Sequence, residues 1–110
     1  MRIRDLAGIV DAEIIQGVYE DAEVSGGYTS DLLSDVMAHA KAREALITIQ
    51  AHRNTIAVAG LVGASAIILC NGRPVPEDMI EAARDEGIAL LRTDFNQYEV
   101  SGRLWKATRG

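Results

Sequence analysis

Short apolar runs alternate with helix-like segments along the second half of the chain. Near-continuous apolar runs of strand length occur at residues 46–50, 66–70 and 89–92, which is typical of strands covered on both faces. Segments with helical character follow them, at residues 54–63, 76–85 and 95–106. This alternation predicts parallel βαβ units, that is, an α/β fold with a mostly parallel sheet flanked by helices on both faces.

The first 45 residues carry a less regular pattern. Four apolar residues within positions 1–10 recur at helical spacing and predict a short helix there. Residues 12–18 and 21–25 are expected to form two short strands joined by a turn. A helix is predicted over residues 31–42, with Ser30 as its N-cap and an apolar stripe made of Leu32, Leu33, Val36, Met37 and Ala40.

Length and composition place residues 1–110 in one globular domain. Hydrophobic residues make up 48% of the chain and charged residues 25%, close to the globular average and unlike disordered or collagen-like chains. Residues 54–72 carry no charge and approach the length of a membrane span, but they change from an Ala/Gly-rich half to a β-branched half. We therefore expect a buried helix and a buried strand there, and no membrane association.

Charge and cysteine content narrow the classes of function. The net charge of −5, from 11 basic and 16 acidic residues, argues against a nucleic-acid binder that neutralises phosphates. Cys70 is the single cysteine, which excludes an internal disulfide and fits a reducing compartment. The apolar run 6–10 is too short for the core of a signal peptide. The expected location is the cytoplasm.

The parallel arrangement predicts where a ligand would bind. Loops after parallel strands emerge at the carboxyl edge of the sheet, so segments 26–31, 51–54, 70–73 and 93–94 should share one rim. The candidate ligand-binding residues of these loops are Tyr28, Thr29, Ser30, His52, Arg53, Asn54, Asn71, Arg73, Thr93 and Asp94. Two arginines and two helix N-termini favour negative charge, and Tyr28 offers a ring for stacking. We expect a small anion here, such as a nucleotide or another phosphorylated metabolite.

The inventory of catalytic groups is poor. No residue pattern identifies an activated nucleophile, a metal cage or a base with an orienting partner. The expectation is a non-enzymatic protein with no cofactor and no bound metal. Two alternatives stay open: a small enzyme that uses His52, Arg53 and Asp94, and a divalent cation held by Asp31 and Asp35 at four-residue spacing on one helix.

The last predicted helix carries an unusual share of the aromatic residues. Phe95, Tyr98, Leu104 and Trp105 give it more apolar and aromatic surface than one small domain readily covers. This predicts a homodimer formed through the helix. The alternative is that the same four residues close the core.

Three segments resemble the DRTGG domain family, and the resemblance spans residues 2–107. Residues 26–37 resemble the family's strand-to-helix junction, residues 46–53 its strand ending in Asp-Arg, and residues 67–72 its strand ending in Thr-Gly-Gly. His52 stands in place of the Asp, while Cys70 and Asn71 stand in place of the Thr and the first Gly. Arg53 and Gly72 keep the family's letters.

The resemblance implies a fold similar to the N-terminal domain of HPr kinase/phosphorylase and an accessory role. Members of the family accompany CBS domains in regulated pyrophosphatases and lie on the N-terminal side of phosphotransacetylases, and no catalytic activity is assigned to them. A chain of this kind would be a small regulatory or ligand-sensing protein that acts with a partner enzyme. The alternative is a purely structural module that dimerises and docks onto such an enzyme.

Overall fold

The structure, a computed structural model, describes residues 1–109. Helices and strands alternate along most of this length. In chain order they are the 3₁₀ turn η1 (Ile3–Asp5), α1 (Leu6–Ile9), β1 (Glu13–Gln16), β2 (Gly26–Thr29), α2 (Leu33–His39), β3 (Glu44–Thr48), α3 (Arg53–Val62), β4 (Ala66–Leu69), α4 (Glu77–Glu86), β5 (Ala89–Arg92) and α5 (Gln97–Arg109).

The strands form one five-stranded sheet in the order β1-β5-β4-β3-β2. β2, β3, β4 and β5 run parallel, and β1 pairs antiparallel with the outer edge of β5. In the parallel part Leu46 pairs with Ile67, which pairs with Leu90, and all three side chains are buried. The predicted α/β fold with a mostly parallel sheet is therefore confirmed.

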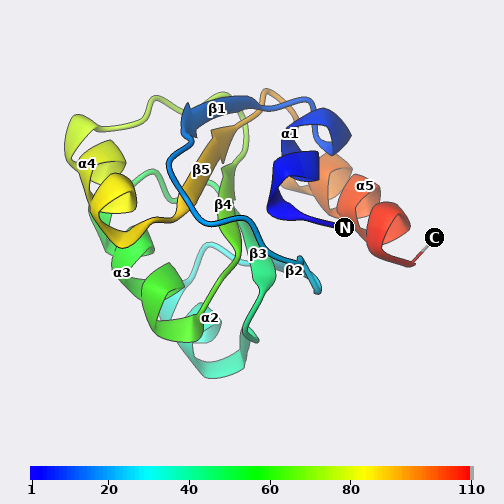
Figure 1. Ribbon diagram of the computed structural model, residues 1–110, viewed down its shortest axis with the longest axis horizontal. Coiled ribbons are helices and arrows are strands. Elements are labelled where there is room, and N and C mark those ends of the chain that lie inside the picture. The colour runs from blue at the N-terminus through cyan, green and yellow to red at the C-terminus, as the bar shows by residue number, and fades with distance from the viewer. Residues whose placement is uncertain (110) are drawn as a thin grey trace.

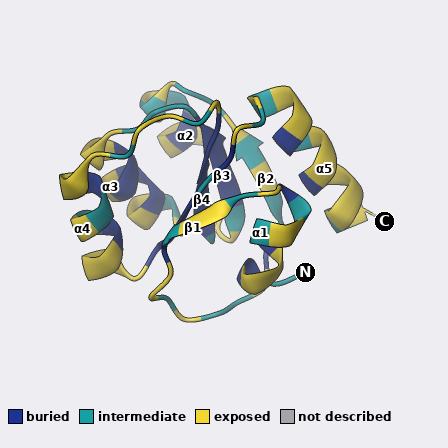
Figure 2. Cartoon of the chain, turned by 90° about the horizontal axis from the view of Figure 1, so that it is seen from above, coloured by how far each residue is buried: buried dark blue, intermediate teal, exposed yellow. Residues whose placement is uncertain are grey.

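Helices cover both faces of the sheet (Figure 1). α2, α3 and α4 pack on one face, and α1 and α5 pack on the other. Because side chains alternate along a strand, Leu46 of β3 belongs to the core half under α2, α3 and α4, whereas Ala45 and Ile47 belong to the half under α1 and α5. The buried residues gather at the sheet, and the outer surfaces of the helices are exposed (Figure 2).

The prediction of a strand at residues 21–25 is wrong. This segment pairs with the N-terminus instead of joining the sheet: the Ile3 amide donates to the Ala22 carbonyl at 3.0 Å, and the Val24 amide donates to the Met1 carbonyl at 2.9 Å. The strand next to β3 is β2, at Gly26–Thr29, where the sequence predicts a loop.

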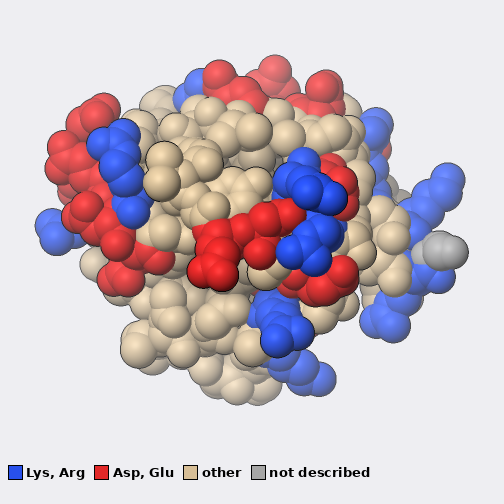
Figure 3. All heavy atoms as spheres, in the orientation of Figure 1, with Lys and Arg blue, Asp and Glu red and all other residues tan. Residues whose placement is uncertain are grey.

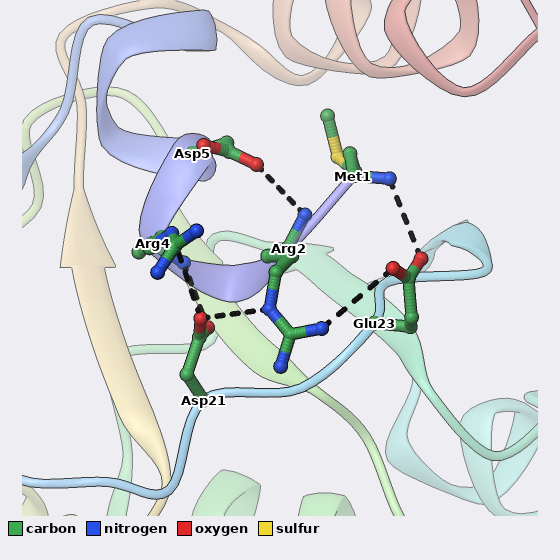
Figure 4. Close-up of polar contacts among 6 residues, drawn as sticks. All are labelled: Met1, Arg2, Arg4, Asp5, Asp21 and Glu23. Carbon is green, nitrogen blue, oxygen red and sulfur yellow. Dashed lines mark hydrogen bonds and ion pairs between the residues drawn. The ribbon is translucent and has the colours of Figure 1, made fainter.

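Ion pairs hold the N-terminal segment against residues 21–23 (Figure 4). The Arg2 guanidinium donates to the Asp21 carboxylate at 2.9 Å, and the amino group of Met1 lies 3.4 Å from the Glu23 carboxylate. The hydrogen bond from Arg2 lowers the pKa of the Asp21 carboxyl below its ordinary value of 3.8. Most of these side chains are partly exposed, so each pair contributes modestly to stability.

Gly27, one of the two glycines of β2, lies directly under α5. A Cβ at this position would lie 2.7 Å from Cδ2 of Leu104 and 3.1 Å from Cδ1 of Ile47. The absence of a side chain therefore lets α5 pack directly on β2. Glycine is rare in strand interiors and often marks a close approach of this kind.

The helices begin close to the predicted positions but with different caps. The N-cap of α2 is Leu32 rather than Ser30, whose hydroxyl accepts a hydrogen bond from the Leu32 amide at 3.2 Å. Val36 is the residue of the predicted stripe that is fully buried, while Leu32, which lies just before α2, and Met37, within it, are exposed. α4 begins after Pro76 and runs to Glu86, one residue beyond the predicted end, with Gly87 as its C-cap at a φ of +66°.

The uncharged stretch 54–72 is a helix followed by a strand, as predicted. α3 and β4 occupy it, and both belong to the core. Within residues 1–109 no helix combines the length and the apolar character needed to cross a bilayer.

Candidate functional site at the carboxyl edge of the sheet

The carboxyl ends of the four parallel strands meet along one edge. The Ser30 amide donates to the Ile47 carbonyl at 3.2 Å, and the Thr93 amide donates to the Leu69 carbonyl at 2.9 Å, so neighbouring ends are joined by hydrogen bonds. We call this edge the carboxyl rim and define it as residues 30–32, 49–54, 70–73 and 93–97. It contains the predicted segments 51–54, 70–73 and 93–94, but only residues 30–31 of the predicted loop 26–31, because residues 26–29 form β2.

The carboxylate of Asp31 ties the centre of the carboxyl rim together. Its Oδ1 accepts hydrogen bonds from the Thr48 hydroxyl at 2.9 Å, the Ile49 amide at 2.9 Å and the Gln97 side-chain amide at 3.0 Å. One carboxylate therefore joins the end of β3 to the start of α5 and to the segment after β2. Thr48 is fully buried, so its hydroxyl needs such an acceptor.

Gln50 extends this network to α3. Its side-chain amide donates to the Asp31 carbonyl at 2.8 Å, and its own carbonyl accepts from the Thr55 hydroxyl at 2.8 Å. No sequence motif marks Thr48, Gln50 or Gln97 as members of this network. The available signal was a pair of polar residues, Thr48 and Gln50, at the end of an apolar strand.

The turns after β4 and β5 lie against each other. The Asn71 amide donates to the Phe95 carbonyl at 2.9 Å, and the Gly72 amide donates to the Thr93 carbonyl at 2.8 Å. Asn71 and Gly72 have φ values of +63° and +59°. A Cβ on Gly72 would lie 2.7 Å from Oδ1 of Asp94, so that carboxylate sits directly over the Gly72 backbone. Asn71 and Asp94 are thus brought together and are both exposed.

Thr93 and Arg73 have different surroundings. Thr93 is buried, and its hydroxyl donates to the Val10 carbonyl at 2.9 Å, so it fastens the N-terminal helix to the sheet. Arg73 is exposed, and its backbone carbonyl accepts a hydrogen bond from Arg92 at 3.4 Å. Of the two, Arg73 is accessible to a ligand.

His52, Arg53 and Asn54 form the exposed start of α3. His52 is the N-cap, and its Nδ1 accepts a hydrogen bond from the Asn54 amide at 3.1 Å. Arg53 and Asn54 line a depression of about 230 Å³ between α3 and α4, to which Asp85 and Glu86 also contribute. The potential beside Arg53 is therefore mixed rather than purely positive.

Tyr28 and Thr29 lie in β2 rather than in the predicted loop, so they point to opposite faces of the sheet. The Tyr28 hydroxyl donates to Oδ2 of Asp35 at 2.8 Å, and its ring packs in the core half under α2. The Thr29 hydroxyl lies 2.7 Å from the Ser101 hydroxyl of α5. The structure therefore does not bring these two side chains together at one place on the rim.

Tyr28→Phe is expected to destabilise the fold at neutral pH and to lose that effect in acid. Hydrogen bonds from Tyr28, Ser30 and His39 hold the pKa of the Asp35 carboxyl below its ordinary value of 3.8. A carboxyl with a lowered folded-state pKa stabilises the fold above the unfolded value, and this contribution disappears as the pH falls through the folded value. Urea unfolding from about pH 7 down to about pH 2 measures the difference, with Tyr98→Phe as the exposed control. A difference that persists unchanged into acid would contradict the assignment.

Asp31 and Asp35 do not form the helical pair considered for a divalent cation. Asp31 lies before α2 and is bonded to β3 and α5, whereas Asp35 is bonded to Tyr28. Within residues 1–109 no group of three or more His, Cys, Asp and Glu side chains could hold a metal ion.

The Cys70 thiol lies at the base of the rim and is buried. Burial raises its pKa to about 11, and the nearby carboxylate of Asp31 adds to the rise. A thiol with this pKa is protonated at neutral pH and is a poor nucleophile. What the rim offers is therefore a set of hydrogen-bonding and charged groups for holding a ligand.

Comparisons with known proteins identify the fold. No family model matches the chain. A segment of 39 residues, 36% of this chain, is 44% identical to HPr kinase/phosphorylase from Streptococcus uberis and covers 13% of that protein.

A solved structure matches almost the whole chain. It contains the CBS and DRTGG domains of the regulatory region of a Clostridium perfringens pyrophosphatase, complexed with its activator diadenosine tetraphosphate. The TM-score is 0.72 at 16% sequence identity, over 93% of this chain and 44% of that chain. The chain thus spans less than half of that structure. In its fold, the chain is a DRTGG-like domain, as the three sequence segments predict.

Proposed function

We propose that the chain is a non-enzymatic regulatory domain that binds a small phosphorylated anion at the carboxyl rim. The observation that carries the proposal is the start of α3, where Arg53 and Asn54 are exposed in the first turn of a ten-residue helix at the carboxyl edge. A guanidinium and a helix N-terminus both favour negative charge. The regulatory role is supported by the pyrophosphatase structure of similar fold, which holds a nucleotide activator.

The other groups of the rim suit a nucleotide better than a bare polyanion. Asp94 is exposed beside Asn71 and offers acceptors for hydroxyl or amino donors of a ligand. Asp85 and Glu86 line the depression next to Arg53, and their carboxylates repel a ligand that is negatively charged along its whole length. A ligand with one anionic end and one end rich in donors satisfies both sets of groups. His52, Asn71 and Arg73 complete the proposed site.

Arg53→Ala is expected to weaken ligand binding by about tenfold to a hundredfold, because a charge-assisted hydrogen bond contributes about 1.5 to 3 kcal/mol. Thermal-shift measurements with AMP, ATP, diadenosine tetraphosphate, acetyl phosphate and inorganic phosphate identify a ligand, since binding to the native state raises its stability. Calorimetry on the variant then gives the loss of affinity.

Lys106→Ala is the matched control, because it removes one exposed cation of α5 and leaves the rim unchanged. The proposal is rejected if none of these compounds binds, or if Arg53→Ala keeps the affinity of the unmodified chain. Docking onto a partner without a ligand would then be the better explanation of the fold.

The proposed setting is the cytoplasm, with a partner enzyme that the domain regulates. The pyrophosphatase of similar fold carries its CBS and DRTGG domains in a regulatory region of the enzyme itself, which supports this arrangement. A single buried thiol suits a reducing compartment.

A homodimer through α5 is a separate proposal with narrower support than the sequence suggests. Leu104 is buried and Phe95 packs against the core, so these two residues close the domain itself. Tyr98 and Trp105 remain, with 88% and 62% of their surfaces exposed. Light scattering at micromolar concentration is expected to give twice the mass of 11.9 kDa. A monomer in this experiment would reject the dimer.

A further inference from the structure

β2 has a free edge. It pairs with β3 on one side and is the outermost strand of the sheet. The Ser30 amide donates to the Ile47 carbonyl of β3. Because backbone directions alternate along a strand, the N–H and C=O groups of Tyr28, two residues earlier, also point toward β3. Gly27 and Thr29 therefore turn their N–H and C=O groups outward. Unpaired groups of this kind are a template for another strand.

A groove of about 240 Å³ runs between this edge and α5. Gly26, Gly27 and Ile47 line it on the side of the sheet, and Leu104 and Trp105 line it on the side of the helix. The contact between the Thr29 and Ser101 hydroxyls, at 2.7 Å, crosses from β2 to α5.

Gly27 is exposed at the edge of β2, so an added strand can reach its backbone, and the groove beside it has room for a side chain. A residue that pairs with Gly27 points toward α5, as Gly27 itself would if it had a side chain. There it meets Leu104 and the ring of Trp105, which is 62% exposed. An aliphatic side chain at this position would cover the tryptophan.

The end of the groove near Ser25 carries one exposed cation, Arg109, and one carboxylate, Glu44. The Arg109 guanidinium stacks on the Trp105 ring, 4.2 Å from its centroid, and lines this end. Glu44 lines the groove as well and keeps its negative charge; its carboxylate accepts the Lys41 amide at 2.6 Å, in the turn before β3, which leaves Arg109 as the charged group that stacks on Trp105. A strand antiparallel to β2 has its carboxyl end here, so an acidic residue at that end would meet Arg109.

We propose that an extended acidic peptide of a partner protein adds to β2 as a sixth, antiparallel strand in this groove. Its pattern is an aliphatic residue opposite Gly27 and, two residues later on the same face, an acidic residue or the terminal carboxylate near Arg109. Addition of a strand to a sheet edge is a recurrent mode of peptide recognition, in which the main chain gives affinity and alternate side chains give specificity.

A second copy of the chain fits the groove less well. Two β2 strands paired about a twofold axis would present only the side chains of Gly27 and Thr29 to the α5 side, which leaves the groove unfilled. The same axis would place the two α5 helices, each with Arg103, Lys106 and Arg109, on one face of the joined sheet. Repulsion between these cations opposes the pairing.

The test uses the full chain and the fluorescence of Trp105, which is the single tryptophan. The probe is the acetylated hexapeptide TVTLTE with a free carboxylate, and the control is acetylated TVTLTK with an amidated end. The acidic peptide is expected to change the fluorescence saturably, to shift the amide NMR signals of Gly27 and Thr29, and to bind at least about tenfold more tightly than the control.

Two charge-reversal variants of α5 distinguish binding in the groove from nonspecific attraction of the acidic peptide to a basic helix. Arg109→Glu is expected to weaken binding of the acidic peptide by at least about tenfold, whereas Lys106→Glu, which faces a separate depression beside Ile9, changes it by less than about twofold. Arg53→Ala should leave peptide binding unchanged, so failure at the carboxyl rim and failure here are distinguishable.

Three results would overturn the proposal. They are the absence of saturable binding of the acidic peptide at millimolar concentration, equal effects of the two charge reversals, and Gly27 and Thr29 signals that shift with protein concentration in the absence of peptide. The last result would assign the edge to a second copy of the chain.

Discussion

Leu104→Ala is expected to lower the free energy of unfolding by about 2 to 5 kcal/mol, the usual cost of removing a buried leucine side chain. Leu104 is 1% exposed and belongs to the core half between α5 and the sheet. Its Cδ2 fills the space above Gly27. Removing it leaves a cavity where α5 meets β2, and this cavity would open toward the groove. Urea unfolding followed by circular dichroism measures the loss.

Tyr98→Ala on the same helix is the control for Leu104→Ala. Tyr98 is 88% exposed, so we expect a change within about 0.5 kcal/mol. Equal losses for the two variants would show that α5 is held through its outer face, which would contradict the packing described above.

Asp31→Ala is expected to destabilise the domain by about 2 to 4 kcal/mol and to loosen the carboxyl rim. The substitution removes the acceptor shared by Thr48, Ile49 and Gln97. The Thr48 hydroxyl would remain buried without its partner, and unpaired buried donors are costly. Chemical denaturation gives the loss of stability. Hydrogen exchange at the Ile49 amide reports the local opening directly, because that amide donates to Asp31.

Asp31→Asn separates the charge from the hydrogen bonds. Asparagine keeps one carbonyl acceptor of the same shape, so it should recover most of the stability that alanine loses. If Asn is as damaging as Ala, the negative charge itself is what the rim requires. If neither variant changes stability, the network does not hold the rim together.

The regular half of the fold could be predicted because its signals are local. β3, β4 and β5 are continuous apolar runs, and each is followed by a segment with a helical pattern. β2 could not be predicted in the same way, because Gly26 and Gly27 have low strand propensity and are typical of turns. They form a strand because α5, more than 70 residues later, packs on Gly27 through Leu104. Only the tertiary structure reveals this contact.

The position of the carboxyl rim followed from topology, but the roles of its side chains did not. Parallel connections bring Asn71 and Asp94 together whatever their rotamers. In contrast, the Thr93 hydroxyl donates to the Val10 carbonyl and the Tyr28 hydroxyl donates to Asp35. No motif in the sequence marks either partner. In the sequence, Asp31 stands out only by its spacing from Asp35. Its bonds to Thr48 and Gln97 depend on where β3 ends and α5 begins, to within a single residue.

β1 is far in sequence from β5, its partner strand, and this separation affects the order of folding. Glu13 pairs with Arg92, 79 residues later, and the segment between β1 and β2 crosses from one edge of the sheet to the other (Figure 1). During synthesis the units from β2 to β4 can assemble while β1 still has no partner strand. Closing so long a loop is entropically costly and slow.

Clusters of acidic and of basic side chains lie on opposite sides of the molecule. Acidic side chains gather over α4 and basic ones at the end of α5, on opposite sides of the view in Figure 3. β1 lies on the α4 side, where the Gln16 side chain donates to the Ile88 carbonyl, between α4 and β5, at 2.9 Å. Because its partner strand is β5, the first strand of this domain to be synthesised is expected to be the last to join the sheet, and a nascent chain that stops before β5 would carry it as an unpaired, aggregation-prone segment.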